Sequence, residues 1–152
     1  MSQARGTYFE DMEVGWEAVS PGRTVTEADI VTFAGLSGDY NVVHADAEHA
    51  RGTVFGERVA HGLLGLSIAS GLLMRATPME GTAEAFLGLE WKFKGPIVIG
   101  DTIRAQAKVT RRRLMKALKG GIVDLELAVV NQRDEVVQEG TWRLLIRSRE
   151  RG

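Results

Sequence analysis

The chain has 152 residues, of which 44% are hydrophobic and 26% charged, and its formal net charge is −1. One soluble globular domain with a single core is expected from this length and composition. Because Lys plus Arg (19) nearly balances Asp plus Glu (20), the chain as a whole has no attraction for nucleic acid or an anionic membrane. The absence of cysteine excludes disulfides, thiol nucleophiles and thiolate metal sites.

No targeting or membrane-spanning segment is predicted. The first twelve residues contain no apolar run, so we expect no signal peptide. The longest uncharged stretch, from Gly62 to Met74, is shorter than the ~20 residues that cross a bilayer. We therefore expect a single cytoplasmic domain over residues 1–152.

The first half of the chain is predicted to hold a capped helix followed by a turn-rich segment. Thr26 and Asp29 have the spacing of a capping box, which predicts that a helix begins directly after Thr26. Gly38 is expected to end this helix. Asp46 then caps one short helical turn, and residues 51–60 are expected to form a loop.

A second helix is predicted from His61 to about Ala76. Its leucine, isoleucine and methionine side chains surround the helix instead of forming a stripe, which predicts that the helix is buried on most sides. Small residues such as Gly65 and Gly71 would let another backbone or a ligand come close.

The second half of the chain has the alternating pattern of strands. Apolar residues alternate with polar ones over residues 87–93, 103–109, 123–129 and 142–146, so each strand is expected to have one buried face. Glycine-containing turns separate these runs at hairpin-like spacing. A helix followed by an antiparallel meander predicts an α+β fold in which the sheet wraps the helix. Residues 147–152 are expected to form a flexible charged tail.

The segment from Gly38 to His44 contains the residues best suited to chemistry. A carboxylate at Asp39 and an imidazole at His44 can converge on one water molecule and share proton transfer. The free backbone N–H groups at the start of the helix after His61 can stabilise an oxyanion. Taken singly, Asp39 also fits a turn residue and His44 a hydrogen-bonded core histidine.

These motifs resemble those of the MaoC-like dehydratases, the R-specific enoyl-CoA hydratases with a hot-dog fold. The similarity covers nearly the whole chain. It is carried by Phe9-Glu10-Asp11, Arg23-Thr24-Val25-Thr26, Phe33-Ala34-Gly35-Leu36-Ser37-Gly38-Asp39-Tyr40-Asn41, His44, Phe55-Gly56, Ala60-His61-Gly62 and Gly95-Pro96-Ile97-Val98-Ile99-Gly100-Asp101. The resemblance implies a long helix wrapped by an antiparallel sheet, dimerisation through that sheet, and action on acyl-CoA thioesters with no metal or redox cofactor.

The resemblance also implies roles for individual residues. Asp39 and His44 would be the catalytic pair, and Asn41 would help to hold their geometry. The backbone N–H of Gly62 would bind the thioester oxygen, and Ser70 would lie near the acyl pocket. One position differs from the family pattern, because Val42 stands where the family usually has a proline after the asparagine.

Other polar residues have less specific interpretations. His61 is expected to be a structural residue that orients the site. Tyr40 fits either packing or substrate contact. The run Arg111-Arg112-Arg113 fits either a solvated hairpin end or a clamp on the phosphates of coenzyme A. His44, Asp46, His49 and His61 do not have an established ligand spacing, so no metal is expected.

The sequence therefore predicts a hydro-lyase of fatty acid metabolism that reversibly hydrates trans-2-enoyl-CoA to (R)-3-hydroxyacyl-CoA. Coenzyme A would enter only as part of the substrate, and no other cofactor, nucleic acid or membrane partner is expected. A homodimer or dimer of dimers is predicted, because the apolar surface exceeds what one chain readily covers. The alternatives are a hot-dog thioesterase, which the absence of an acid from residues 62–74 disfavours, and a non-catalytic acyl-CoA-binding subunit.

Overall fold

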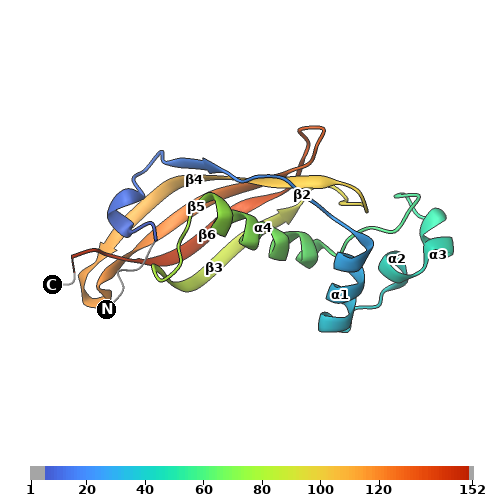
Figure 1. Cartoon of the computed structure of the whole chain (residues 1–152), viewed down its shortest axis with the longest axis horizontal. Helices are drawn as coiled ribbons and strands as arrows, with labels where there is room; N and C mark the ends of the chain where they lie inside the picture. The colour runs from blue at the N-terminus through green and yellow to red at the C-terminus, as the bar shows by residue number, and fades with distance from the viewer. Residues whose placement is uncertain (1–5, 151–152) are drawn as a thin grey trace.

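The computed structural model describes residues 6–150, which form one curved antiparallel sheet around one long helix (Figure 1). The strands are β1 (Glu17–Val19), β2 (Arg23–Thr24), β3 (Ala83–Phe93), β4 (Thr102–Met115), β5 (Gly120–Val130) and β6 (Val136–Arg147). The α-helices are α1 (Glu27–Ser37), α2 (Val42–Ala45), α3 (Ala47–Arg51) and α4 (Gly62–Ala76), and two 3-10 turns span Phe9–Asp11 and Lys116–Leu118.

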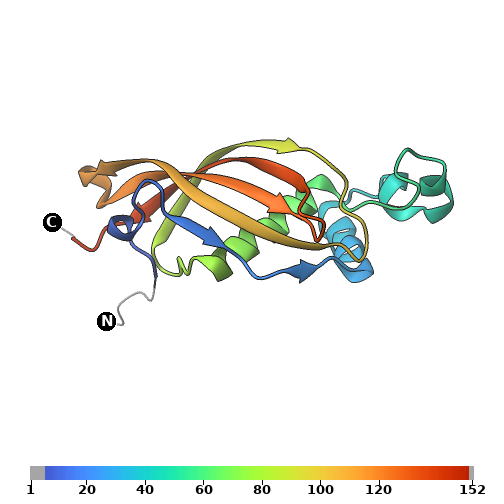
Figure 2. The same cartoon turned by 90° about the horizontal axis from the view of Figure 1, so that it is seen from above.

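All strand pairs are antiparallel, and the strand order is β1-β4-β5-β6-β3, with β2 paired to the start of β4. The helix α4 lies along one face of this sheet, and α1 to α3 project beyond the end of the sheet at which α4 begins (Figures 1 and 2). A sheet that curves around one central helix is the hot-dog arrangement, so the predicted α+β fold is confirmed.

The predicted buried faces of the three central strands are confirmed. Apolar residues of β4, β5 and β6 form the core together with one side of α4. These residues include Ile103, Ala105, Ala107, Val109, Val123, Leu125, Leu127, Val129, Trp142, Leu144 and Ile146.

The prediction of a buried face was wrong for β3 within one chain. This strand is at the edge of the sheet, and Phe86, Leu89 and Phe93 remain 43–55% exposed although they face the side on which α4 lies. Two irregularities in the pairing with β6, around Ala83 to Gly88, also interrupt its alternation. Of the predicted buried face only Trp91 is partly buried against the core, whereas Leu87, Leu89 and Phe93 stay exposed.

The helix α4 is likewise covered on one side only. Leu64, Ile68 and Leu72 are buried against the sheet, whereas Leu63 is 59% and Met74 40% exposed on the other side. The expectation that the helix is buried on most sides is therefore wrong for the single chain, because one sheet covers one face. Among residues 6–150, no helix combines the length and the apolar composition needed to cross a membrane.

Local signals around the first helix are confirmed. Thr26 and Asp29 form the predicted capping box, and Gly38 ends α1 with a φ of 75°, a conformation that glycine adopts at little cost. Asp46 accepts a hydrogen bond from the N–H of His49 and so caps α3. The segment before it is more regular than the predicted turn, because Asn41 caps the one-turn helix α2, which contains His44.

The predicted tail is partly ordered structure. Arg147 is the last residue of β6, and Ser148 is buried with its hydroxyl hydrogen-bonded to the carboxylate of Glu10. Arg149 pairs with Asp11 at 2.6 Å. The acids of the first 3-10 turn thus hold residues 147–149 against the body of the protein, while residues 151–152 lie outside the described part of the chain.

Candidate active site

Three of the predicted site residues meet at the start of α4. Asp39 follows the end of α1, His44 lies on α2, and His61 immediately precedes α4. One ligand-type atom from each residue lies within 4.8 Å of the others. Segments that are separated in the sequence come together here because α1 lies beside the start of α4 (Figure 1) and the ring of His44 stacks on that of His61.

The ring of His44 has a defined orientation. Its Nδ1 lies 2.8 Å from the carbonyl oxygen of Val59. Because a carbonyl can only accept a hydrogen bond, we assign the proton to Nδ1, which leaves Nε2 with a free lone pair. Asn41 supports the helical turn beneath the ring, since its side-chain oxygen accepts from the N–H of Val43 at 3.4 Å. The half-buried imidazole is thus held ready to accept a proton through Nε2.

The carboxylate of Asp39 is exposed at the mouth of the site. One of its oxygens accepts a hydrogen bond from the N–H of Asn41 at 3.1 Å, which fixes the side chain against the following turn. Within residues 6–150 the second oxygen has no hydrogen bond or ion pair, so it is available to a water molecule or a substrate. The carboxylate and the imidazole can therefore contact the same small molecule.

His61 lies between the two. Its ring is 2% exposed, stacks on the ring of His44 with centroids 3.8 Å apart, and contacts Phe33 at 4.9 Å. Its Nε2 lies 2.9 Å from the carbonyl oxygen of Asp39 and so donates to it. These contacts agree with the orienting role expected from the sequence.

The geometry of the two histidines does not fit a shared metal ion. Their rings are nearly parallel, inclined by 27°. A metal must lie close to the plane of each imidazole that binds it, at ~2.0–2.1 Å from the nitrogen. Two stacked rings with centroids 3.8 Å apart do not direct their nitrogens to one point at such a distance, so one of the rings would have to turn and break its hydrogen bond to the main chain.

Gly62 begins α4, where backbone N–H groups have no partner within the helix. A Cβ atom at this position would lie 2.8 Å from two ring atoms of Phe93, so a side chain there requires that ring to move. Phe93 ends β3 and is 55% exposed. The ring of Phe93 therefore lies against the bare first turn of α4, and the sequence predicted only the glycine.

A buried glutamine also supports this turn, and sequence reasoning missed it. Gln138 of β6 is 2% exposed, donates from Nε2 to the carbonyl of Gly62 at 3.0 Å, and accepts from Nε1 of Trp91 at 3.0 Å. Gly65 makes room for it, since a Cβ at Gly65 would lie 2.4 Å from its Nε2. The only signal in the sequence is a glutamine among the apolar residues of this strand. That signal does not indicate which groups the glutamine contacts.

The other predicted substrate-binding residues lie farther away. Ser70 is on the exposed side of α4, about 12 Å along the helix from Gly62, and its hydroxyl donates to the carbonyl of Ser67 at 2.6 Å. Tyr40 is 62% exposed, and its hydroxyl lies back against α1 near Gly35. Neither residue touches the histidines, although Ser70 lies along the open face of α4.

The three consecutive arginines differ in their contacts. An irregularity in the β4–β5 pairing between Val109 and Arg111 shifts the alternation, so Arg112 pairs with the core residue Val123 and stacks on Phe9, 4.1 Å from its ring centre. The guanidinium of Arg112 also donates to the carbonyl of Met12 at 3.4 Å. Arg112 therefore has a packing role of its own, and its contact with coenzyme A stays a prediction.

Arg111 and Arg113 are also far from the catalytic pair of the same chain. Together with Arg112, Ile122, Asp124 and Arg143 they line a small surface pocket of about 150 Å³. They lie near the end of β4, about 30 Å along the strand from Thr102, whose end of the sheet adjoins the site. Contact of these two residues with coenzyme A remains a prediction.

Comparisons with known proteins agree with this geometry. A family model described as "MaoC like domain" matches residues 13–131. An (R)-specific enoyl-CoA hydratase from Rhodospirillum rubrum is 41% identical over 103 residues, which are 68% of this chain and 69% of the relative. The crystal structure of a MaoC-like dehydratase from Rhodospirillum rubrum superposes with a TM-score of 0.86 at 30% identity, covering 95% of this chain and 99% of that one. A Mycobacterium tuberculosis protein with a double hot-dog fold shares the fold at 20% identity and a TM-score of 0.81, over 94% of this chain and 44% of that one.

Proposed function

Because this chain belongs to the MaoC-like domain family, we propose that it catalyses the reversible hydration of trans-2-enoyl-CoA thioesters to (R)-3-hydroxyacyl-CoA. One observation carries the proposal: the Asp39 carboxylate and the oriented His44 imidazole converge at the first turn of α4. The R configuration of the product rests on the printed name of the Rhodospirillum rubrum relative.

The chemistry needs a group that activates water and a group that delivers a proton. A water molecule between the free oxygen of Asp39 and Nε2 of His44 would be held by two acceptors. As its oxygen attacks C3 of the enoyl thioester, the pair takes one proton from the water. The pair then delivers one proton to C2. Each correctly placed acid or base typically contributes ~10²–10⁴-fold to the rate.

The start of α4 supplies the electrostatic part. Attack at C3 pushes electrons onto the thioester oxygen, which becomes an enolate. We expect the N–H of Gly62 and the positive end of the dipole of α4, which begins at Gly62, to stabilise that charge. Removing one such donor typically costs ~10²–10³-fold in rate. Hydration moves only water and a proton, so coenzyme A enters the proposal as part of the substrate and no further cofactor is invoked.

The proposal includes a homodimer. Among residues 6–150, β3 is an edge strand that pairs only with β6, and its apolar side chains Phe86, Leu89 and Phe93 are exposed. Pairing of β3 with its copy would continue the sheet and place a second chain beside the open face of α4. Light scattering at micromolar concentration should give twice the chain mass, and a monomer would exclude this assembly.

Loss of the ultraviolet absorbance of the conjugated enoyl thioester tests the activity. Purified protein should bleach at least one member of a panel of trans-2-enoyl-CoA esters of increasing chain length, and chiral analysis should identify the R product. Release of free coenzyme A thiol instead would indicate a thioesterase. Tight binding of acyl-CoA by calorimetry, with neither bleaching nor thiol release, would indicate a binding subunit and contradict the proposal.

The thioesterase alternative is disfavoured by the composition of the central helix. Hydrolysis requires attack of water at the thioester carbon, for which a carboxylate on the central helix is suited. Residues 62–76 of α4 contain no acid. The carboxylate of the site is on the Asp39 turn, and it lies with the two histidines.

A further inference from the structure

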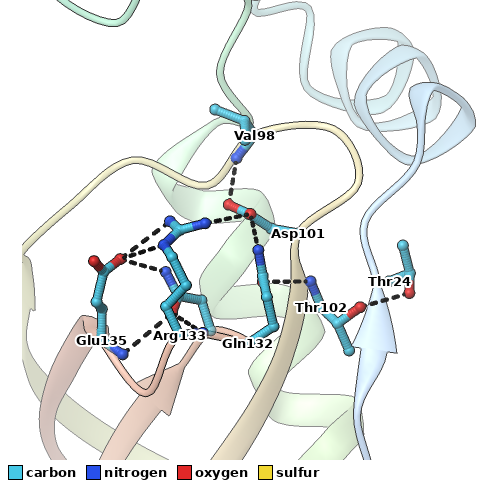
Figure 3. A network of polar contacts seen from close by, with 8 residues as sticks. Thr24, Val98, Asp101, Thr102, Gln132, Arg133 and Glu135 are labelled. Carbon is cyan, nitrogen blue, oxygen red and sulfur yellow. Dashed lines mark hydrogen bonds and ion pairs between the residues drawn. The ribbon is translucent and has the colours of Figure 1, made fainter.

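Asp101 is a buried carboxylate remote from the catalytic pair. It ends the loop between β3 and β4 and is 3% exposed. Its Oδ2 accepts the N–H of Val98 at 3.0 Å, and its Oδ1 accepts Nε2 of Gln132 at 2.8 Å (Figure 3). The guanidinium of Arg133 lies 3.8 Å from the same Oδ1. The carboxylate therefore joins its own loop to the hairpin between β5 and β6.

The loop is held from a second side as well. The N–H of Val25 donates to the carbonyl of Asp101 at 2.8 Å, and the N–H of Gly100 donates to the carbonyl of Val25 at 2.8 Å. Gly100 has a φ of 95°, which favours glycine and lets the chain turn back at this point. Hydrogen bonds to both its side chain and its main chain hold Asp101 in place. They thereby fix the conformation of the loop that contains it.

This fixed loop contacts the segment that orients the catalytic histidine. Val98 forms an isolated antiparallel bridge with Val59. The N–H of Ala60 donates to the carbonyl of Ile97 at 2.7 Å. The carbonyl of Val59 is in turn the acceptor for Nδ1 of His44 at 2.8 Å. A short chain of contacts therefore leads from the Asp101 carboxylate through two backbone segments to the imidazole.

From this geometry we infer that Asp101 is a positioning residue for His44, acting through Val98 and Val59. The inference deepens the proposed hydratase function and rests on it for the kinetic consequence. Asp101 holds the Val59 carbonyl where it selects the tautomer with the proton on Nδ1, so that Nε2 keeps its lone pair toward the site. Free imidazole side chains favour the opposite tautomer, so a displaced carbonyl would lower the reactive fraction of His44.

A carboxylate suits this position because both neighbours are donors. The N–H of Val98 and the amide of Gln132 each need an acceptor. An asparagine would turn an NH₂ group toward one of them and leave that contact repulsive. Gln132 cannot flip freely in response, because its Oε1 already accepts the N–H of Thr102 at 3.0 Å. The substitution Asp101→Asn therefore disturbs the loop with almost no change in volume.

The experiment compares Asp101→Asn with Glu135→Gln, a matched change of carboxylate to amide. Glu135 contacts Arg133 and Asn131 in the same hairpin, without touching Val98 (Figure 3). For Asp101→Asn, kcat should fall about tenfold with KM changed less than twofold, since the lost contact serves the reacting group and not substrate binding. For Glu135→Gln, both constants should stay near those of the parent.

Nitrogen-15 spectra of the His44 ring give a readout independent of turnover. The parent should show the tautomer protonated on Nδ1, Asp101→Asn a mixture of tautomers, and Glu135→Gln the parent pattern. If Asp101→Asn does not fold, Gln132→Leu, an exposed change that removes one donor to Asp101, should shift kcat and the tautomer in the same direction by less.

An unchanged His44 spectrum in a folded Asp101→Asn variant would overturn the positioning role. Equal losses of kcat in Asp101→Asn and Glu135→Gln would also overturn it. The two proposals fail separately. A parent protein without hydratase activity would contradict the proposed function, and the tautomer spectra would still decide the link from Asp101 to His44.

Discussion

The imidazole of His44 stacks on the imidazole of His61, with ring centroids 3.8 Å apart and planes inclined by 27°. The buried ring of His61 also donates to the carbonyl oxygen of Asp39 at 2.9 Å. One side chain thus contacts the ring of one proposed catalytic residue and the main chain of the other. We therefore expect His61 to help to set the position of the pair without taking part in proton transfer.

Replacing His61 tests this relationship. His61→Phe keeps a flat ring for stacking and removes the hydrogen bond to the Asp39 main chain, so kcat should fall about tenfold with a smaller change in KM. His61→Leu removes both contacts and should cost more. Steady-state hydration of an enoyl-CoA ester measures both variants, and parental kcat in the phenylalanine variant would show that the hydrogen bond positions nothing.

The proposed catalytic pair should behave as one unit. Asp39→Asn and His44→Ala are each expected to lower hydratase turnover by ~10²-fold or more, because both groups serve one transition state. The double variant should be barely worse than either single one. Circular dichroism checks that the variants remain folded. Near-parental turnover in either folded single variant would show that the replaced residue is a turn or core residue and not a catalytic one.

Val42 should accept the proline that the family usually has at this position. Val42 is the first residue of α2, where proline is favoured, and Asn41 already has the extended conformation (φ −51°, ψ 135°) that precedes a proline. We expect Val42→Pro to keep activity and to raise the free energy of unfolding by ~0.4–1 kcal/mol through the unfolded state. Chemical denaturation measures the gain, and a loss of stability would show that the turn differs from this geometry.

The first turn of α4 should be sensitive to added bulk. Gly62→Ala places a Cβ within 2.8 Å of the Phe93 ring, so the ring must shift across the proposed oxyanion site. Turnover should fall at least tenfold. The double variant Gly62→Ala with Phe93→Ala relieves the contact and should recover part of the loss. Absence of any recovery would indicate that the methyl group blocks the substrate directly and not through Phe93.

Acid should weaken a specific ion pair on the outer face of the sheet. Arg143 donates to both oxygens of Asp124, at 2.7 and 2.9 Å, and these hydrogen bonds hold the pKa of Asp124 below its ordinary value. A carboxylate with a lowered folded-state pKa stabilises the fold above its unfolded pKa of about 3.9. That contribution is lost as the pH falls through the folded-state pKa.

Asp124→Asn should therefore lower the free energy of unfolding at pH 7 by about 1 kcal/mol, since Arg143 is half exposed. The difference from the parent should begin to shrink below about pH 4, where the carboxylate of the unfolded chain becomes protonated, and should vanish once the pH falls below the lowered folded-state pKa. Urea unfolding at pH 7 and at a pH below about 4 measures this difference in the free energy of unfolding. Glu126→Gln on the same strand is the control. A difference that persists unchanged at low pH would mean that charge is not its source.

Several features followed from the sequence alone because neighbours along the chain decide them. The cap formed by Thr26 and Asp29, the glycine end of α1 at Gly38 and the cap at Asp46 involve residues within a few positions of one another. The buried faces of β4 to β6 follow from the period of two along an extended chain. The likeness of Asp39 and His44 to a known motif is likewise local.

Only the tertiary structure decided which distant groups meet. The acceptor of His44 is Val59, in a segment that reads as a plain loop, and the support of Gly62 is Gln138 from the last strand. A single irregularity in the pairing of β4 places Arg112 opposite Val123, where its guanidinium stacks on Phe9. Such contacts depend on strand register and loop conformation, which are set by the packing of the whole chain, and no pattern within a few residues records them.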